Sequence, residues 1–289
     1  CCAACGKHEA TRRPLSLCNQ CNTAQYCNRE CQLKHLIECK MQTTYVENLT
    51  CCVCMDDLQV DSDTFTRMTC CGKGMHLHCD ERIEESTMPQ AQKNRCPECR
   101  EEYPETGEGN VKQVRVWVDK GKAWAQTQLA SDYKFGEGVP QSYEEAIKYL
   151  NMAIKQGCPN AMHALATLYK DGEGVAQSFE NAAELYALAA NQGHRGAQYE
   201  LGVFYDNGTG VAKSFENSIE LYTLAANQGF AHAQFNLGVF YDDGNGVAQS
   251  NDMARKWWLK AALQGAENAI QELKTLDEKD GKTTPTLPS

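Results

Sequence analysis

Apolar residues in the later part of the chain recur at steps of three and four residues, and the whole pattern returns every 36 residues. Such spacing places the apolar side chains on one face of a helix. In one unit this stripe consists of Ala161, Leu165, Leu168 and Tyr169. Because one helix cannot bury the stripe alone, neighbouring units must cover it. The pattern predicts an all-α solenoid of helix pairs over residues 111–276.

Glycines separate the units. One set is spaced by 36 residues, at Gly121, Gly157, Gly193, Gly229 and Gly265. A second set forms glycine-rich turns inside the units, at residues 171–175, 206–211 and 243–247. After each turn a serine stands where a helix N-cap belongs, namely Ser178, Ser214 and Ser250. We predict a partial repeat, four repeats that end near residues 157, 193, 229 and 265, a cap to residue 276, and a flexible tail over 277–289.

The pattern AQxxLGxxYxxGxGV occurs at residues 197–211 and 233–247. It resembles the Sel-one-like repeat, a relative of the tetratricopeptide repeat. The resemblance implies a right-handed α/α solenoid that binds segments of partner proteins, and it implies no catalytic residue. We therefore expect protein clients on the solenoid.

Sixteen of the seventeen cysteines lie in the first 99 residues, mostly as close pairs. Two thiolates spaced as CxxC can share one tetrahedral zinc ion. A disulfide framework would also use dense cysteines. Histidines at ligand spacing and a cysteine-poor helical region favour a reducing compartment instead. We expect a zinc-folded front part and an intracellular protein, cytoplasmic or nuclear.

The chain has 28 basic and 38 acidic residues, which gives a formal net charge of −10. This balance argues against nonspecific binding to nucleic acid or anionic lipid, which needs clustered Lys and Arg. No run of about 18 apolar residues occurs, as a membrane-spanning helix would need. We expect neither a membrane nor a nucleic acid as partner.

The cysteines of residues 1–40 are interspersed with the pairs Tyr26-Cys27 and Cys31-Gln32, an arrangement similar to the MYND zinc finger. In that family the ligand pairs interleave around two ions. The resemblance assigns Cys2, Cys5, Cys27 and Cys31 to one zinc, and Cys18, Cys21, His35 and Cys39 to the other.

This segment departs from the family at its last ligands. Either the final helix is one turn shorter and His35 is a ligand, or Cys39 replaces the histidine and the last ligand is lost at Thr43. The first alternative is favoured. His35 and Cys39, at i and i+4, project from one helix face and can bind one ion. His8 is the reserve ligand.

After a linker at 41–50, residues 51–103 resemble a RING finger, which opens with Cys51-Cys52-Val53-Cys54 and closes with Cys96-Pro97-Glu98-Cys99. The resemblance implies a small α+β fold with two zinc ions. It assigns Cys51, Cys54, His76 and Cys79 to one ion, and Cys70, Cys71, Cys96 and Cys99 to the other. His78 is the rival of His76, and Lys73 stands where the family expects a ligand. A connector at 104–110 leads to the solenoid.

Four zinc ions are therefore expected, two in each finger, and each has four protein ligands. Such sites leave no open position for water, so the metal is structural. RING fingers commonly act as ubiquitin ligases that position a ubiquitin-loaded conjugating enzyme. The resemblance places Val53 and Pro97 in the groove for that enzyme, and Arg100 at the linchpin position that holds the thioester.

The leading functional hypothesis is a RING-type ubiquitin ligase that recruits clients through its repeats and its MYND-like finger. The alternative is a non-enzymatic zinc-finger scaffold for protein–protein interaction.

Overall fold

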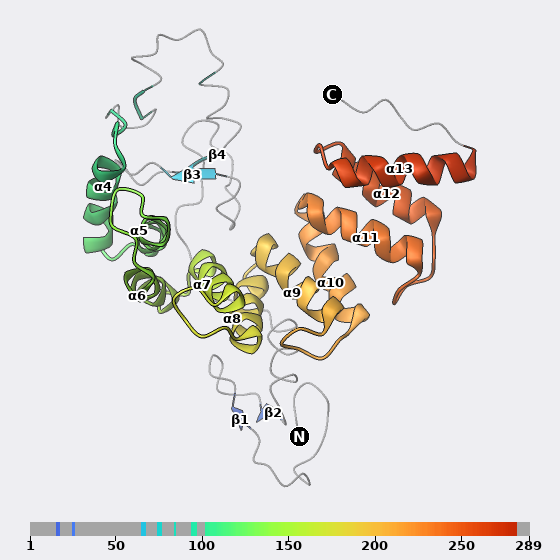
Figure 1. Cartoon of the computed structure of the whole chain (residues 1–289), viewed down its shortest axis with the longest axis horizontal. Coiled ribbons are helices and arrows are strands. Elements are labelled where there is room, and N and C mark those ends of the chain that lie inside the picture. Colours follow the sequence, from blue (N-terminus) through green and yellow to red (C-terminus); the bar gives the residue numbers. More distant parts are fainter. Residues whose placement is uncertain are drawn as a thin grey trace. The chain divides into compact units, whose positions relative to one another are not determined.

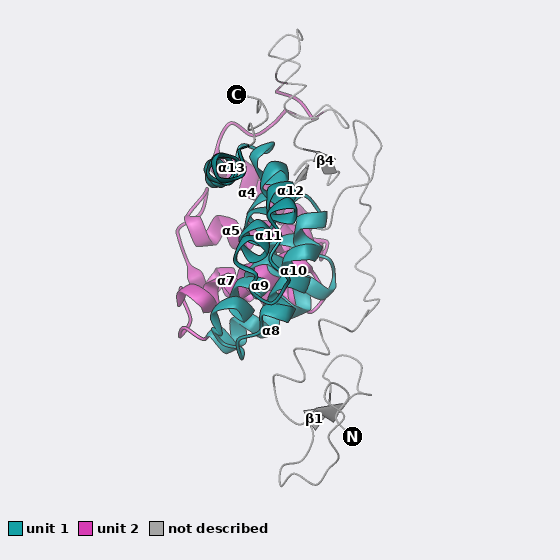
Figure 2. Cartoon of the chain, turned by 90° about the vertical axis from the view of Figure 1, so that its right-hand side faces the viewer, with its two compact units in different colours: residues 1–40, 179–289 teal, residues 41–178 magenta. Residues whose placement is uncertain are grey.

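The computed structural model describes residues 16–17, 25–26, 65–67, 74–76, 84, 94–96 and 102–281. Two antiparallel strand pairs precede the helices. They are β1 (Ser16–Leu17) with β2 (Gln25–Tyr26), and β3 (Phe65–Arg67) with β4 (Gly74–His76). The chain divides into two compact units, one of residues 1–40 and 179–289 and one of residues 41–178 (Figure 2).

Ten helices occupy the described range 102–281 (Figure 1). The unit of residues 41–178 contains α4 (Gly107–Asp119), α5 (Ala123–Phe135), α6 (Tyr143–Ile154) and α7 (Pro159–Asp171). The other unit contains α8 (Phe179–Asn191), α9 (Arg195–Asn207), α10 (Phe215–Asn227), α11 (Ala231–Asp243), α12 (Asn251–Ala262) and α13 (Glu267–Asp280). Within each unit every helix packs on the next one along the chain. The all-α architecture predicted from the periodicity is confirmed for this range.

Serine caps begin two of these helices as predicted. The side-chain oxygen of Ser214 accepts a hydrogen bond from the backbone N–H of Asn217 at 3.2 Å, and Ser250 accepts from Met253 at 3.3 Å. Each bond satisfies a donor that the first helical turn leaves unpaired. Replacing such a cap by Ala typically costs about 1 kcal/mol of stability.

The glycine-rich turns are packing elements. At Gly246 the backbone is left-handed (φ 70°), and an added Cβ would lie 2.7 Å from the Cβ of Phe215, the first residue of α10. Only glycine combines this backbone conformation with so close an approach. The turn after α11 is therefore fixed against the preceding helix pair.

Small residues also allow helices to approach each other. A Cβ added at Gly202 on α9 would lie 2.8 Å from the ring of Tyr222 on α10, and Gly238 on α11 faces the indole of Trp258 on α12. The indole Nε1 donates to the carbonyl oxygen of Phe235 at 3.1 Å. Both aromatic side chains are almost fully buried. These pairings join consecutive helices of the repeats.

Pairs of glutamines, each with one buried member, link consecutive repeats at a 30-residue separation. Gln228 donates from Nε2 to Oε1 of Gln198 at 2.7 Å, and Gln264 donates to Gln234 at 2.8 Å. Gln198 in turn donates to the carbonyl oxygen of Ala190 at 3.1 Å. Because a buried amide must find partners, these chains of bonds fix the register between neighbouring helix pairs.

α4 begins earlier than the sequence predicted. Its first residue, Gly107, lies inside the predicted connector at 104–110. Thr106 provides the reason, because its Oγ1 accepts from the backbone N–H of Gly109 at 3.1 Å and caps the helix.

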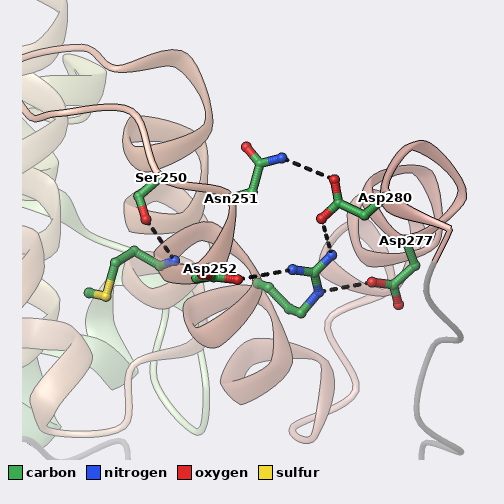
Figure 3. Close-up of polar contacts among 7 residues, drawn as sticks. Ser250, Asn251, Asp252, Asp277 and Asp280 are labelled. Carbon is green, nitrogen blue, oxygen red and sulfur yellow. Dashed lines mark hydrogen bonds and ion pairs between the residues drawn. The ribbon is translucent and has the colours of Figure 1, made fainter.

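α13 continues to Asp280, past the start of the predicted tail at residue 277. Arg255 on α12 holds this last turn. Its Nε donates to Asp277 at 2.9 Å and its Nη2 to Asp280 at 2.8 Å, among the contacts that Figure 3 shows. The hydrogen bond to Asp280 is the largest cause that raises the pKa of Arg255 above its usual value. The last turn is thus part of the packed repeat array.

None of the helices in the described residues is both long and apolar enough to cross a membrane. Cys158, the cysteine of the repeats, is 1% exposed and acts as a small core residue.

Candidate zinc-binding segments and partner surface

The first cysteine-rich segment contains the β1–β2 pairing, with Ser16 opposite Tyr26 and Leu17 opposite Gln25. The connection between the strands, residues 18–24, begins with Cys18 and contains Cys21, and Cys27 follows β2 directly. The paired strands therefore hold together the two ends of the connection that carries this CxxC pair. Thiolates together with an imidazole are a donor set that suits zinc.

The second cysteine-rich segment contains the β3–β4 pairing. Phe65 lies opposite His76, and Arg67 lies opposite Gly74. The connection at residues 68–73 carries the adjacent Cys70 and Cys71. His76 is the last residue of β4, and its backbone alone is described.

The last predicted cysteine pair lies in a loop whose two ends pair with each other. Arg95 and Glu102 form an isolated antiparallel bridge, and the backbone N–H of Tyr103 donates to the carbonyl oxygen of Asn94 at 2.9 Å. The side chains of Arg95 and Glu102 also form an ion pair, but both are exposed, so the pair adds little stability. Cys96, the first residue inside the loop, is fully buried. A buried thiol at the base of a closed loop fits a ligand of a closed zinc site.

Cys96 is the predicted ligand whose side chain lies within the described part of the chain. The other predicted ligands, His76 apart, lie outside the described residues: Cys2, Cys5, Cys18, Cys21, Cys27, Cys31, His35, Cys39, Cys51, Cys54, Cys70, Cys71, Cys79 and Cys99. Val53, Pro97 and Arg100 of the predicted enzyme groove also lie outside them. These ligand and groove assignments stay predictions.

A cluster of aromatic side chains joins α9 to α11. The centre of the Tyr199 ring lies 5.2 Å from the ring centre of Phe230 and 5.9 Å from that of His232. The ring centres of Phe230 and His232 are 5.6 Å apart. Tyr199 and Phe230 are half-buried, whereas His232 is exposed. Asn236, one turn after His232 on α11, hydrogen-bonds to the hydroxyl of Tyr199. We call these four residues the aromatic surface.

Burial keeps the hydroxyls of this region protonated. Burial, and next the charge of Glu200, raises the pKa of Tyr199 above its ordinary value. Burial likewise raises the pKa of Tyr222, whose hydroxyl also bonds to Asn236. The two hydroxyls stay neutral across the physiological range, so the aromatic surface presents rings and an amide without phenolate charge.

Sequence reasoning missed the aromatic surface because its members come from two repeats. Aligning the repeats at the 36-residue period would have found it. The position of Phe230 is occupied by Cys158, His194 and Ala266 in other repeats, and that of Tyr199 by Thr127, His163 and Phe235.

The first full repeat carries a buried carboxyl group at a core position. Asp132 on α5 is 2% exposed, where the next repeats have Leu168, Phe204 and Phe240. Its Oδ1 accepts from Gln128 at 3.0 Å, while no hydrogen-bond partner for Oδ2 lies among the described residues. Burial raises the pKa of Asp132 to about 6.

Comparison with known families adds to this geometry. Residues 2–43 match the MYND finger, and residues 125–158, 159–194, 196–230 and 231–265 match the Sel1 repeat. The chain carries a MYND finger and four Sel1 repeats. The MYND match implies zinc binding in the first cysteine-rich segment. These matches do not support the RING resemblance of residues 51–103, which stays a prediction.

Solved structures show the same repeat fold. The Sel1 repeat protein from Oxalobacter formigenes is 27% identical with a TM-score of 0.58, over 62% of this chain and 72% of that one. The protein c5321, a protective antigen of uropathogenic Escherichia coli with an SLR fold, is 28% identical with a TM-score of 0.57. That match covers 62% of this chain but only 39% of the E. coli chain. No curated protein matches the chain.

Proposed function

We propose that this chain is a zinc-binding adaptor that holds one protein partner on its MYND finger and another on its Sel1 repeats. The aromatic surface carries the proposal. The cores of α8–α13 are filled by Ala, Leu and aromatic side chains. Phe230 packs against this core but stays half-buried, beside the exposed His232. Aromatic side chains at the surface are enriched where proteins meet.

Crosslinking with mass spectrometry on cells that express the full chain tests this proposal. An adaptor predicts two separable sets of partners, one linked to residues 2–43 and one linked to the repeats. The double variant Cys18→Ser/Cys21→Ser should lose the first set and keep the second. Loss of both sets, or a single set linked to both regions, would contradict two independent surfaces.

RING-type ubiquitin ligase activity is the second candidate. The closed loop that begins at Cys96 supports it, because a backbone-paired turn around a cysteine pair suits a zinc site there. In this candidate Val53 and Pro97 contact the conjugating enzyme, Arg100 holds the ubiquitin thioester, and the chain binds four zinc ions.

An autoubiquitination assay with a panel of conjugating enzymes separates the two candidates. A ligase predicts ubiquitin chains that depend on zinc and fall strongly with Arg100→Ala. Absence of signal with every conjugating enzyme, in a preparation that contains its zinc, rejects the ligase and leaves the adaptor.

A further inference from the structure

The packing of the repeat explains the aromatic surface only in part. Tyr199 and Phe230 pack against the buried cluster that includes Tyr222, but the start of α11 does not need an aromatic ring. Phe230 occupies the N-cap position of α11 and makes no side-chain capping bond there. The same position holds His194 before α9, whose Nδ1 accepts from Ala197 at 3.1 Å, and Ala266 before α13. A small or a capping residue therefore serves the fold at this position. The half-buried ring of Phe230 adds apolar area at the surface that the helix start does not require.

The rings of this surface accept cations. The guanidinium of Arg195 already lies over the ring of Phe230, 5.5 Å from its centre. The face of an aromatic ring attracts a cation within about 6 Å. Tyr199 and His232 extend the aromatic area beside Phe230 at centre distances of 5.2 and 5.6 Å. A partner cation would thus find several rings within one side chain's reach.

The charge around the aromatic surface favours a cationic partner. α9 and α11, which carry the surface, contain four carboxylates and one guanidinium. Glu200 directly follows Tyr199, whereas Asp206, Asp242 and Asp243 lie in the last turns of the two helices. Residues 179–281 as a whole contain fourteen acidic and seven basic residues. A field of this sign speeds the approach of basic segments and opposes acidic ones.

We propose that the aromatic surface on α9 and α11 binds an extended protein segment that carries arginine side chains. The guanidinium planes stack on the rings of Phe230, Tyr199 and His232, while the carboxylates of the two helices balance their charge. Arginine fits better than lysine because its planar group stacks on a ring and is more weakly hydrated. This inference rests on the proposed adaptor function and names the partner of its repeat surface.

Fluorescence anisotropy on the full chain tests the proposal. The probe is a labelled peptide in which Arg alternates with Gly and Ala, compared with peptides that carry Lys or Glu in place of Arg. We expect the Arg peptide to bind best and the Glu peptide not to bind. Phe230→Ala and His232→Ala should each weaken binding of the Arg peptide by about fivefold or more, from loss of a stacked ring.

Both variants should fold, since Ala266 occupies the equivalent position of Phe230 and His232 is exposed. Thermal unfolding checks this, and Leu224→Ala on α10, another exposed apolar residue, is the matched control that should bind normally. Equal binding of the Glu peptide, or full affinity in Phe230→Ala, overturns the proposal. Self-association in sedimentation that Phe230→Ala abolishes would assign the surface to a second copy instead. If the peptides fail while repeat-linked partners persist in crosslinking, the adaptor function stands and the arginine segment is rejected.

Discussion

Arg255 on α12 donates from Nε to Oδ1 of Asp277 on α13 at 2.9 Å, and the carboxylate of Asp277 is only 4% exposed. An ion pair with one buried member contributes more to stability than a surface pair, because removing the cation leaves the buried carboxylate without a partner.

Arg255→Ala should therefore lower the free energy of unfolding by about 2–3 kcal/mol, less than for a fully buried pair because Arg255 is itself partly exposed. Urea unfolding followed by circular dichroism measures the effect. The control is Lys256→Ala, the exposed neighbour on the same helix, which should change stability by less than about 0.5 kcal/mol. Equal losses in the two variants would mean that the pair contributes nothing specific.

Asp132 should make the stability of the first full repeat depend on pH. Its pKa in the folded chain is about 6, against 3.8 for the free side chain. A carboxyl group whose pKa is raised by folding stabilises the fold in its protonated form, so this contribution is complete below about pH 4 and is lost as the pH rises through 6. The loss should amount to about 3 kcal/mol.

Asp132→Leu, which copies Leu168 of the next repeat, should remove this pH dependence and stabilise the chain at pH 7.5. Urea unfolding between about pH 4 and 7 would detect the change, and Asp252→Leu, an exposed aspartate, serves as the control. A pH profile that is identical in the wild type and in Asp132→Leu would rule out Asp132 as the source.

Gly238→Ala should destabilise the contact between α11 and α12. Alanine favours helices by about 1 kcal/mol over glycine, but here its methyl group would overlap the indole of Trp258. Overpacking of a tight core costs about 1–3 kcal/mol, so a net loss is expected. A double-mutant cycle with Trp258→Ala measures it, since Gly238→Ala should become neutral or stabilising once the indole is absent. A gain in stability on the wild-type background would contradict the close approach.

Zinc removal should affect the front of the chain and spare the helices. Structural zinc contributes about 10–16 kcal/mol of apparent binding energy in finger peptides, which exceeds what such small cores supply. A chelator should release zinc while the far-ultraviolet signal of α4–α13 persists. Metal analysis should give four ions per chain if both fingers bind, and two if only the MYND finger does. Melting of the helices together with zinc release would show that the repeats depend on the metal.

The 36-residue period sufficed to predict the helix pairs, because each repeat presents the same apolar stripe and the same glycine turns. It could not predict where α13 ends. The pairing of Arg255 with Asp277 joins residues 22 positions apart in a unit that departs from the repeat pattern, and a periodic pattern carries no information about such a bond.

The candidate site was predicted unevenly for a similar reason. Cysteine spacing predicts a zinc ligand directly, because the two thiolates of a CxxC pair can bind the same ion. The aromatic surface depends on Tyr199 of α9 meeting Phe230 at the start of α11, far along the chain, and neither residue is unusual by itself. Asp132 could have been found by aligning the repeats, because the equivalent positions hold only Leu and Phe.

The small residues that admit Tyr222 and Trp258 also determine whether the array can grow. Gly202 and Gly238 leave room for an aromatic side chain of the following helix, whereas α13 places Lys274, an exposed cation, at the equivalent position. A long charged side chain there would block a further helix from docking. A further helix packed on this face of α13 would therefore need a smaller residue in place of Lys274.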